Sequence, residues 1–156
     1  MAAEVGSKAP VLTLPNQDLQ PVDLGAEFAK GTTILAFFPG AFTSVCTKEM
    51  CTLRDSLAQL NKANARVLGI SVDMPFTLKV FARENGLTFP LLSDFNKEAI
   101  RRYGIYLADF VGFKGVAKRS VFVVDKHGIV RYSQILDSPG HEPDYAKLNE
   151  AVAELS

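Results

Sequence analysis

The segment TTILAFFPGAFTSVC, residues 32–46, joins an apolar run to a short loop and the start of a predicted helix. The run from Thr32 to Phe38 is almost unbroken and lies between Gly31 and Pro39, which is typical of a strand buried on both faces. Beyond the loop, a helix is predicted from Thr43 to about Lys62, because leucines recur there at helical spacing. A strand with two buried faces needs cover on both, so the segment indicates an α/β protein.

The rest of the chain alternates strands and helices around this segment. On the helix predicted over 75–84, Phe76, Val80 and Phe81 are expected on the packed face. The alternation, followed by a hairpin, predicts an α/β sandwich with a mixed central sheet flanked by helices. Ligands bind such sheets beyond the carboxyl ends of parallel strands, so chemistry is expected at the loop 39–45. The other predicted elements are a hairpin over 10–24 that turns at 16–18, strands over 65–72, 89–92, 120–124 and 129–136, and helices over 96–103 and 143–155.

Composition narrows the class of protein. The 156 residues suit one domain, 1–156, and 47% hydrophobic with 22% charged residues is normal for a soluble globular chain. Net charge is zero, so neither nucleic acid nor an anionic membrane is expected as a partner. Met1 to Gly6 lacks the pattern of a signal peptide, and the two cysteines are too few for a disulfide-built secreted fold. We therefore expect a cytoplasmic location, with an organelle after removal of a transit peptide left open.

Cys46 falls in the first turn of the helix that follows the buried strand. If Thr43 is the N-cap, Cys46 lies among the unpaired backbone N–H groups, where the helix dipole favours a thiolate. A thiolate is the nucleophilic form of cysteine. Position alone leaves a second interpretation open, in which Cys46 is a small buried apolar residue.

Residues 39–46, PGAFTSVC, resemble the peroxiredoxin signature Pro-x-x-x-Thr/Ser-x-x-Cys at every defined position. The resemblance to this AhpC/TSA superfamily continues in the opening around Gly6 to Leu14, in FPLLSD (89–94) and in RSVFVVD (119–125). It implies a thioredoxin-like fold with an added N-terminal hairpin. The implied activity is a thiol-dependent peroxidase that reduces hydrogen peroxide and organic hydroperoxides, with no cofactor.

The resemblance also implies roles for the residues near Cys46. Cys46 is the expected peroxidatic nucleophile, which becomes a sulfenic acid, and Pro39 would shield it from water. Thr43 and the Arg119 guanidinium would bind the peroxide oxygens, with Phe42 as part of the substrate site. The remaining basic neighbour, Lys118, is interpreted as a surface charge. Glu49, three residues after Cys46, either braces the arginine, as in Q-type and E-type relatives, or is a solvated helix residue.

Cys51 follows Cys46 by five residues, as in the Q-type, or bacterioferritin comigratory, peroxiredoxins, where the second cysteine resolves the first. Along a helix this spacing separates the Cα atoms by roughly 8–9 Å, whereas a disulfide needs about 7 Å or less. Either the helix unwinds on oxidation, which we favour, or Cys51 is a spectator. Residues 41–43 and the approach to Arg119 look more like E-type alkyl hydroperoxide reductases, some of which lack a resolving cysteine.

Other functions and partners are weighed on the same residues. Cys-x-x-Cys is absent, which disfavours a thioredoxin-type reductase, and His127 and His141 lie in predicted turns, so no metal site is expected. A redox-sensing module that relays oxidation to a partner protein is the alternative to an enzyme. Thioredoxin or a similar thiol donor is the expected reductant. Phe42, Phe110 and Phe113, in predicted loops, suggest a homodimer built at the active-site edge.

Overall fold

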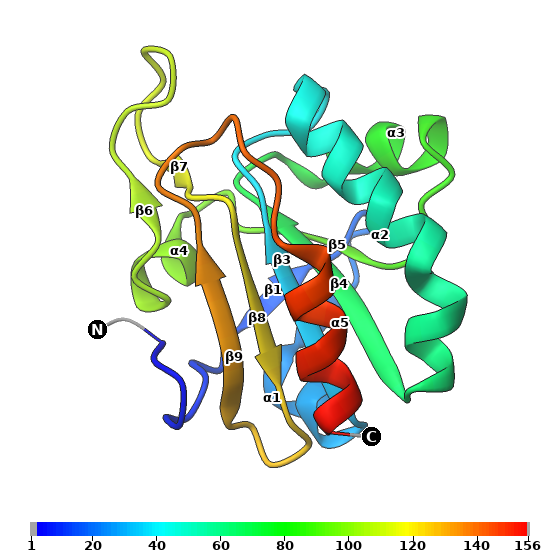
Figure 1. Cartoon of the computed structure of the whole chain (residues 1–156). Coiled ribbons are helices and arrows are strands. Elements are labelled where there is room, and N and C mark those ends of the chain that lie inside the picture. The colour runs from blue at the N-terminus through cyan, green and yellow to red at the C-terminus, as the bar shows by residue number, and fades with distance from the viewer. Residues whose placement is uncertain (1–2, 156) are drawn as a thin grey trace.

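Central strands that are buried on both faces build a five-stranded mixed sheet in the order β5-β4-β3-β8-β9. The computed structural model, shown in Figure 1, describes residues 3–155, so Met1 and Ala2 of the N-terminal stretch considered above lie outside it. β3 pairs parallel with β4 and antiparallel with β8, and β4 pairs parallel with β5. These strands are β3 (Thr32–Phe37), β4 (Ala65–Ser71), β5 (Leu91–Ser93), β8 (Ser120–Val124) and β9 (Val130–Ile135).

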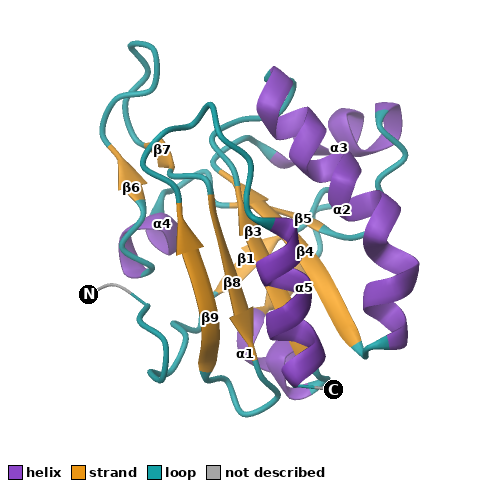
Figure 2. Ribbon diagram, viewed as in Figure 1, coloured by secondary structure: helices purple, strands orange, loops and turns teal. Residues whose placement is uncertain are grey.

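Helices cover both faces of this sheet (Figure 2). Ile34, Ala36 and Phe38 pack in one core cluster with α2 (Ser44–Lys62), α3 (Pro75–Glu84) and α5 (Tyr145–Glu154). The intervening Leu35 and Phe37 belong to the other cluster, with α1 (Leu24–Ala29) and α4 (Glu98–Arg102). Alternate residues of β3 therefore pack in core clusters on opposite faces of the sheet, which explains why the run through β3 is apolar without a break.

The predicted thioredoxin-like architecture, with a mixed sheet between helices and an added N-terminal hairpin, is confirmed. The hairpin pairs β1 (Thr13–Pro15) antiparallel with β2 (Pro21–Asp23). A second ribbon, β6 (Tyr106–Leu107) with β7 (Val116–Ala117), was not predicted. The loop between β6 and β7 projects from the body of the molecule, at the upper left of Figure 1. Within residues 3–155, no helix is long and apolar enough to cross a membrane.

Two local predictions were wrong, and one helix was missed. Phe76 is 61% exposed rather than packed, because the buried face of α3 consists of Leu78, Phe81 and Ala82. The strand predicted from Phe89 begins at Leu91, after Pro90, whose nitrogen has no hydrogen to donate to a ladder. The short helix α1 was missed because its six residues are too few to show a period; its start is marked by Asp23, which accepts a hydrogen bond from Gly25 N.

The topology brings two segments that are distant in sequence to the same end of the sheet, where β3 ends and β8 begins. α2 leaves from the carboxyl end of β3, and Phe37 at that end pairs with Ser120 at the amino end of β8. Arg119, which immediately precedes β8, therefore lies beside the loop that leads into α2. The loop from β9 to α5 lies at the same end of the sheet and passes over it in Figure 1.

Candidate active site

Cys46 occupies the third position of α2, as the sequence predicts. Thr43 is the N-cap, and its backbone oxygen accepts from Thr47 N at 2.9 Å. The Thr43 hydroxyl donates to the carbonyl oxygen of Gly40 at 3.0 Å. Cys46 is a free thiol, fully buried. The first N–H groups of a helix have no partner within it, so the surroundings of this sulfur favour negative charge.

Arg119 is the centre of the site. Its Nη2 donates to Cys46 Sγ at 3.1 Å and its Nη1 to Glu49 Oε1 at 2.7 Å. Nε and Nη2 also donate to the carbonyl oxygen of Pro139, at 3.3 and 3.0 Å. These four bonds leave one of the five N–H donors of the guanidinium without a partner among the described residues. The side chain is 1% exposed, which places a full positive charge in contact with a buried thiol.

Glu49 is a buried partner of this arginine rather than a solvated helix residue. The Glu49 side chain is fully buried, and its Oε2 has no hydrogen-bond partner within residues 3–155. Burial raises the pKa of the Glu49 carboxyl from its ordinary 4.5 to about 7, although the Arg119 guanidinium pulls in the opposite direction. Cys46 and Glu49, three residues apart, thus present two acidic groups to one cation.

The loop before α2 is held from the neighbouring strand. Asp73 Oδ2 accepts from Ala41 N at 2.7 Å and from Ser71 Oγ at 2.7 Å. Phe42 adopts a positive φ of 67°, a conformation that is costly for a bulky residue. Its ring meets that of Phe81 edge-on at 5.2 Å. The site loop is therefore fixed at two points, one polar and one aromatic.

A pocket of about 270 Å³ opens over Arg119. It is lined by Thr43, Ser44, Val45, Phe110, Arg119, Pro139 and Gly140. The structure thus brings Thr43 and Arg119 to one pocket, and Cys46, which does not itself line the pocket, lies behind them in contact with Arg119. Among the described residues, neither Pro39, which is buried, nor Phe42, which is 50% exposed, lines it.

Cys51 lies elsewhere on the same helix. α2 is continuous through both cysteines, and both are free thiols. The thiol of Cys51 donates to Asn85 Oδ1, at the end of α3, at 3.7 Å. Arg54 Nη1 binds the backbone oxygen of the same Asn85. The two sulfurs therefore have different neighbours, Arg119 for Cys46 and Asn85 for Cys51.

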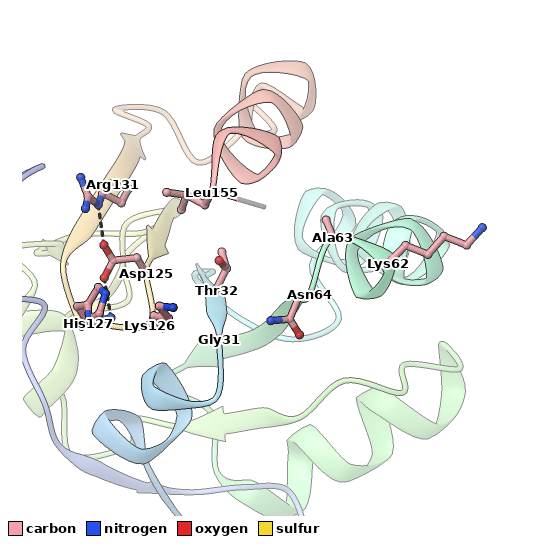
Figure 3. A pocket seen from close by; sticks show the side chains of 10 residues that line it. All are labelled: Gly31, Thr32, Lys62, Ala63, Asn64, Asp125, Lys126, His127, Arg131 and Leu155. Carbon is pink, nitrogen blue, oxygen red and sulfur yellow. Dashed lines mark hydrogen bonds and ion pairs between the residues drawn. The ribbon is translucent and has the colours of Figure 1, made fainter.

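A larger hollow, about 530 Å³, lies at the opposite end of the sheet (Figure 3). Most of its lining residues come from the start of β3, from the end of α2 and from the turn between β8 and β9. Asp125 pairs there with Arg131 at 2.6 Å, and Lys62 extends away from that pair in Figure 3. The length of β3, roughly 20 Å at about 3.3 Å per residue, separates this hollow from Cys46. In residues 3–155, no group of three or more His, Cys, Asp or Glu is placed to hold a metal ion.

A thioredoxin-like sheet with a helix-borne cysteine hydrogen-bonded to a buried arginine is an arrangement typical of thiol redox proteins. The chain belongs to the AhpC/TSA family, which matches residues 5–133. It is 38% identical over 154 residues to alkyl hydroperoxide reductase E of Mycobacterium tuberculosis, covering 97% of each chain. It is 36% identical over 132 residues to peroxiredoxin Bcp of Escherichia coli, covering 83% of each. The structure of peroxidoxin BcpB from Mycobacterium tuberculosis matches with a TM-score of 0.84 at 30% identity, over 97% of this chain and 96% of that one. The chain is thus a thiol-dependent peroxidase, as its sequence predicts.

Two contributors to the site were missed in the sequence. Asp73 stands just after β4, and a polar residue at the carboxyl end of a parallel strand is a signal that could have found it. Pro139 contributes through its backbone oxygen. No side-chain pattern marks a carbonyl acceptor, so the sequence held no signal for it.

Proposed function

We propose that Cys46 is the peroxidatic nucleophile of this peroxidase. The observation that carries the proposal is the 3.1 Å contact between Arg119 Nη2 and Cys46 Sγ in a buried site at a helix start. Both the guanidinium and the helix dipole favour the thiolate over the thiol. The thiolate attacks one peroxide oxygen, the O–O bond breaks, and the leaving oxygen takes a proton to form water or an alcohol.

Thr43 and Arg119 are the proposed substrate-binding groups. Both line the pocket of about 270 Å³, which easily admits hydrogen peroxide and leaves room for the organic part of a larger hydroperoxide. The remaining N–H donor of Arg119 and the unpaired N–H groups of α2 would stabilise the oxygen that gains charge. Pro39, buried at the start of the site loop, would shield the Cys46 thiolate from water. Phe42 lies outside the pocket, so we assign it no contact with the substrate there.

The test is rapid-mixing kinetics with hydrogen peroxide and with an organic hydroperoxide. We expect Cys46→Ser to lose the reaction with both while keeping its fold, and Cys51→Ser, a matched loss of the other sulfur, to keep the first oxidation. Fast peroxide reduction by Cys46→Ser would refute the assignment.

For recycling we propose that Cys51 condenses with the sulfenic acid at Cys46 and that thioredoxin or a similar thiol donor reduces the disulfide. The five-residue spacing supports this route. The specific observation that favours a one-cysteine route instead is the intact helix α2, with Cys51 bonded to Asn85 and away from Arg119. Turnover of Cys51→Ser with a thioredoxin system separates the two: poor turnover supports resolution by Cys51, and normal turnover supports the one-cysteine route.

A further inference from the structure

Two acidic groups share one buried cation at the site. Arg119 binds Cys46 Sγ at 3.1 Å and Glu49 Oε1 at 2.7 Å, and all three side chains are at most 1% exposed. If both acids are ionised, the cluster holds two negative charges and one positive charge away from water. Burying an uncompensated charge is expensive, so a buried cluster of this composition favours having only one acid ionised at a time.

The surroundings of Glu49 disfavour its ionised form. Its Oε2 has no hydrogen-bond donor among the described residues. From the segment that leads into α5, Glu142 faces it with a further negative charge, which Lys48 Nζ partly offsets at 3.3 Å. Tyr145, on α5, donates its hydroxyl proton to Glu142 Oε1 at 2.6 Å. The hydroxyl proton of Tyr145 is therefore committed to Glu142.

We propose that Glu49 is a proton-holding positioning residue: it carries a proton while Cys46 is a thiolate, and releases the proton when oxidation removes that charge. The inference rests on Cys46 as the nucleophile and adds a source for the proton that the reaction consumes. The raised pKa of Glu49, about 7, agrees with a carboxyl that gains or loses its proton near neutral pH.

The step balances in atoms and charge. The Cys46 thiolate, one hydrogen peroxide molecule and the protonated Glu49 carboxyl give the Cys46 sulfenic acid, one water molecule and the Glu49 carboxylate. The sulfur is oxidised, the peroxide is reduced, and the single negative charge passes from sulfur to carboxylate. Arg119 bonds both groups, so it keeps an anionic partner before and after the reaction.

Infrared difference spectroscopy of the full chain, with the thiolate absorbance recorded in parallel, tests the proposal at about pH 6, roughly one unit below the raised pKa of Glu49, where most of the carboxyl is protonated. We expect a protonated carboxyl band in the reduced protein that is absent from Glu49→Gln and disappears together with the thiolate when hydrogen peroxide is added. Net proton uptake per Cys46 oxidised should be close to zero in the parent and close to one in Glu49→Gln.

A second variant keeps the test usable if Glu49→Gln folds poorly. Glu142→Gln removes the like charge that faces Glu49, so the band should titrate at lower pH, whereas Glu150→Gln, an exposed glutamate on α5, should not move it. Loss of the thiolate with no carboxyl band, with an unchanged band or with full proton uptake in the parent would overturn the proposal. A thiolate that persists in peroxide would instead refute Cys46 as the nucleophile.

Discussion

At the scale of single residues, the chemistry depends on how the donors of Arg119 are divided. Pro139 and Glu49 fix the orientation of the guanidinium, so the bond to Cys46 is preorganised rather than formed by a mobile side chain. A lysine could supply the charge there but not the fork of donors that reaches three partners.

Arg119→Met should slow peroxide reduction by about 10²–10³-fold, the usual cost of losing a preorganised donor to developing charge. It should also slow the alkylation of Cys46 by iodoacetamide at a fixed pH, since the sulfur loses its cationic partner. Rapid-mixing kinetics and the rate of iodoacetamide alkylation measure the two effects. The neighbouring Lys118→Met, which changes a partly exposed charge, is the control and should leave both near the parent values.

Glu49 makes stability depend on pH. The unfolded chain releases this proton near pH 4.5 and the folded chain only near 7, so the folded state loses stability as pH rises across that window. The loss should be on the order of a few kcal/mol, since one pKa unit corresponds to about 1.4 kcal/mol. Urea unfolding at several pH values should show this slope in the parent and a flatter profile in Glu49→Gln. Equal slopes would contradict the raised pKa.

Much of the site could be predicted from residues close in sequence. Thr43 and Cys46 lie on one helix turn, so their spacing alone places them together. Arg119 is 73 positions from Cys46, and only the family resemblance linked them; the strand register then explains the contact. Whether Glu49 braces the arginine or faces water was undecidable from spacing, because that depends on which side of α2 the loop from β9 covers.

At the scale of elements, α2 determines what the second cysteine can do. The helix runs unbroken from Ser44 to Lys62, so its geometry keeps Cys46 and Cys51 too far apart to bond. Its first turn is the part most able to open, because those N–H groups have no helical partner. Leu53 anchors the helix beyond Cys51 in the core, whereas Met50, between the two cysteines, would have to give up its core contacts for the helix to open.

Oxidation by one equivalent of peroxide should therefore reduce the helical signal in far-ultraviolet circular dichroism, because the turns between the cysteines must unwind before the disulfide closes. Cys51→Ser should keep its helical signal after the same treatment and overoxidise more readily. An oxidised parent with full helicity and a free Cys51 would show that no such opening occurs.

The elements that were not predicted from the sequence are those in which the local hydrophobic pattern is weakest. α1 and the ribbon of β6 with β7 are short, and their residues are ordered by tertiary contacts rather than by a period. On α3, Phe76 fits the apolar pattern but lies beyond the edge of the sheet-facing stripe, which a period alone cannot reveal.

At the scale of the whole molecule, the candidate active site and an exposed apolar loop lie next to each other. The loop between β6 and β7 carries Val111, 79% exposed, and Phe113, 68% exposed. Its Phe110 lines the pocket over Arg119. Large exposed apolar groups around a site often mark an interface. We propose that a second copy of the chain covers this loop, together with Phe42.

Phe113→Ser combined with Val111→Ser should shift the solution mass from dimer toward monomer, because it removes apolar surface from the proposed contact. Light scattering over a range of concentrations measures the mass. Val5→Ser changes another exposed apolar residue, 59% accessible and far from the loop in sequence, and serves as the control. A parent protein that is monomeric at high concentration would contradict the dimer.

The central claim is that the sulfur of Cys46, hydrogen-bonded by Arg119, is the atom that reacts with peroxide. Mass spectrometry of the intact and digested protein after one equivalent of hydrogen peroxide tests it most directly, with a sulfenic acid trap present throughout. The account predicts that the oxidised peptide contains Cys46, either as the trapped sulfenic acid or in a disulfide with Cys51. Consumption of peroxide with Cys46 unmodified, or a sulfenic acid trapped at Cys51 alone, would contradict it.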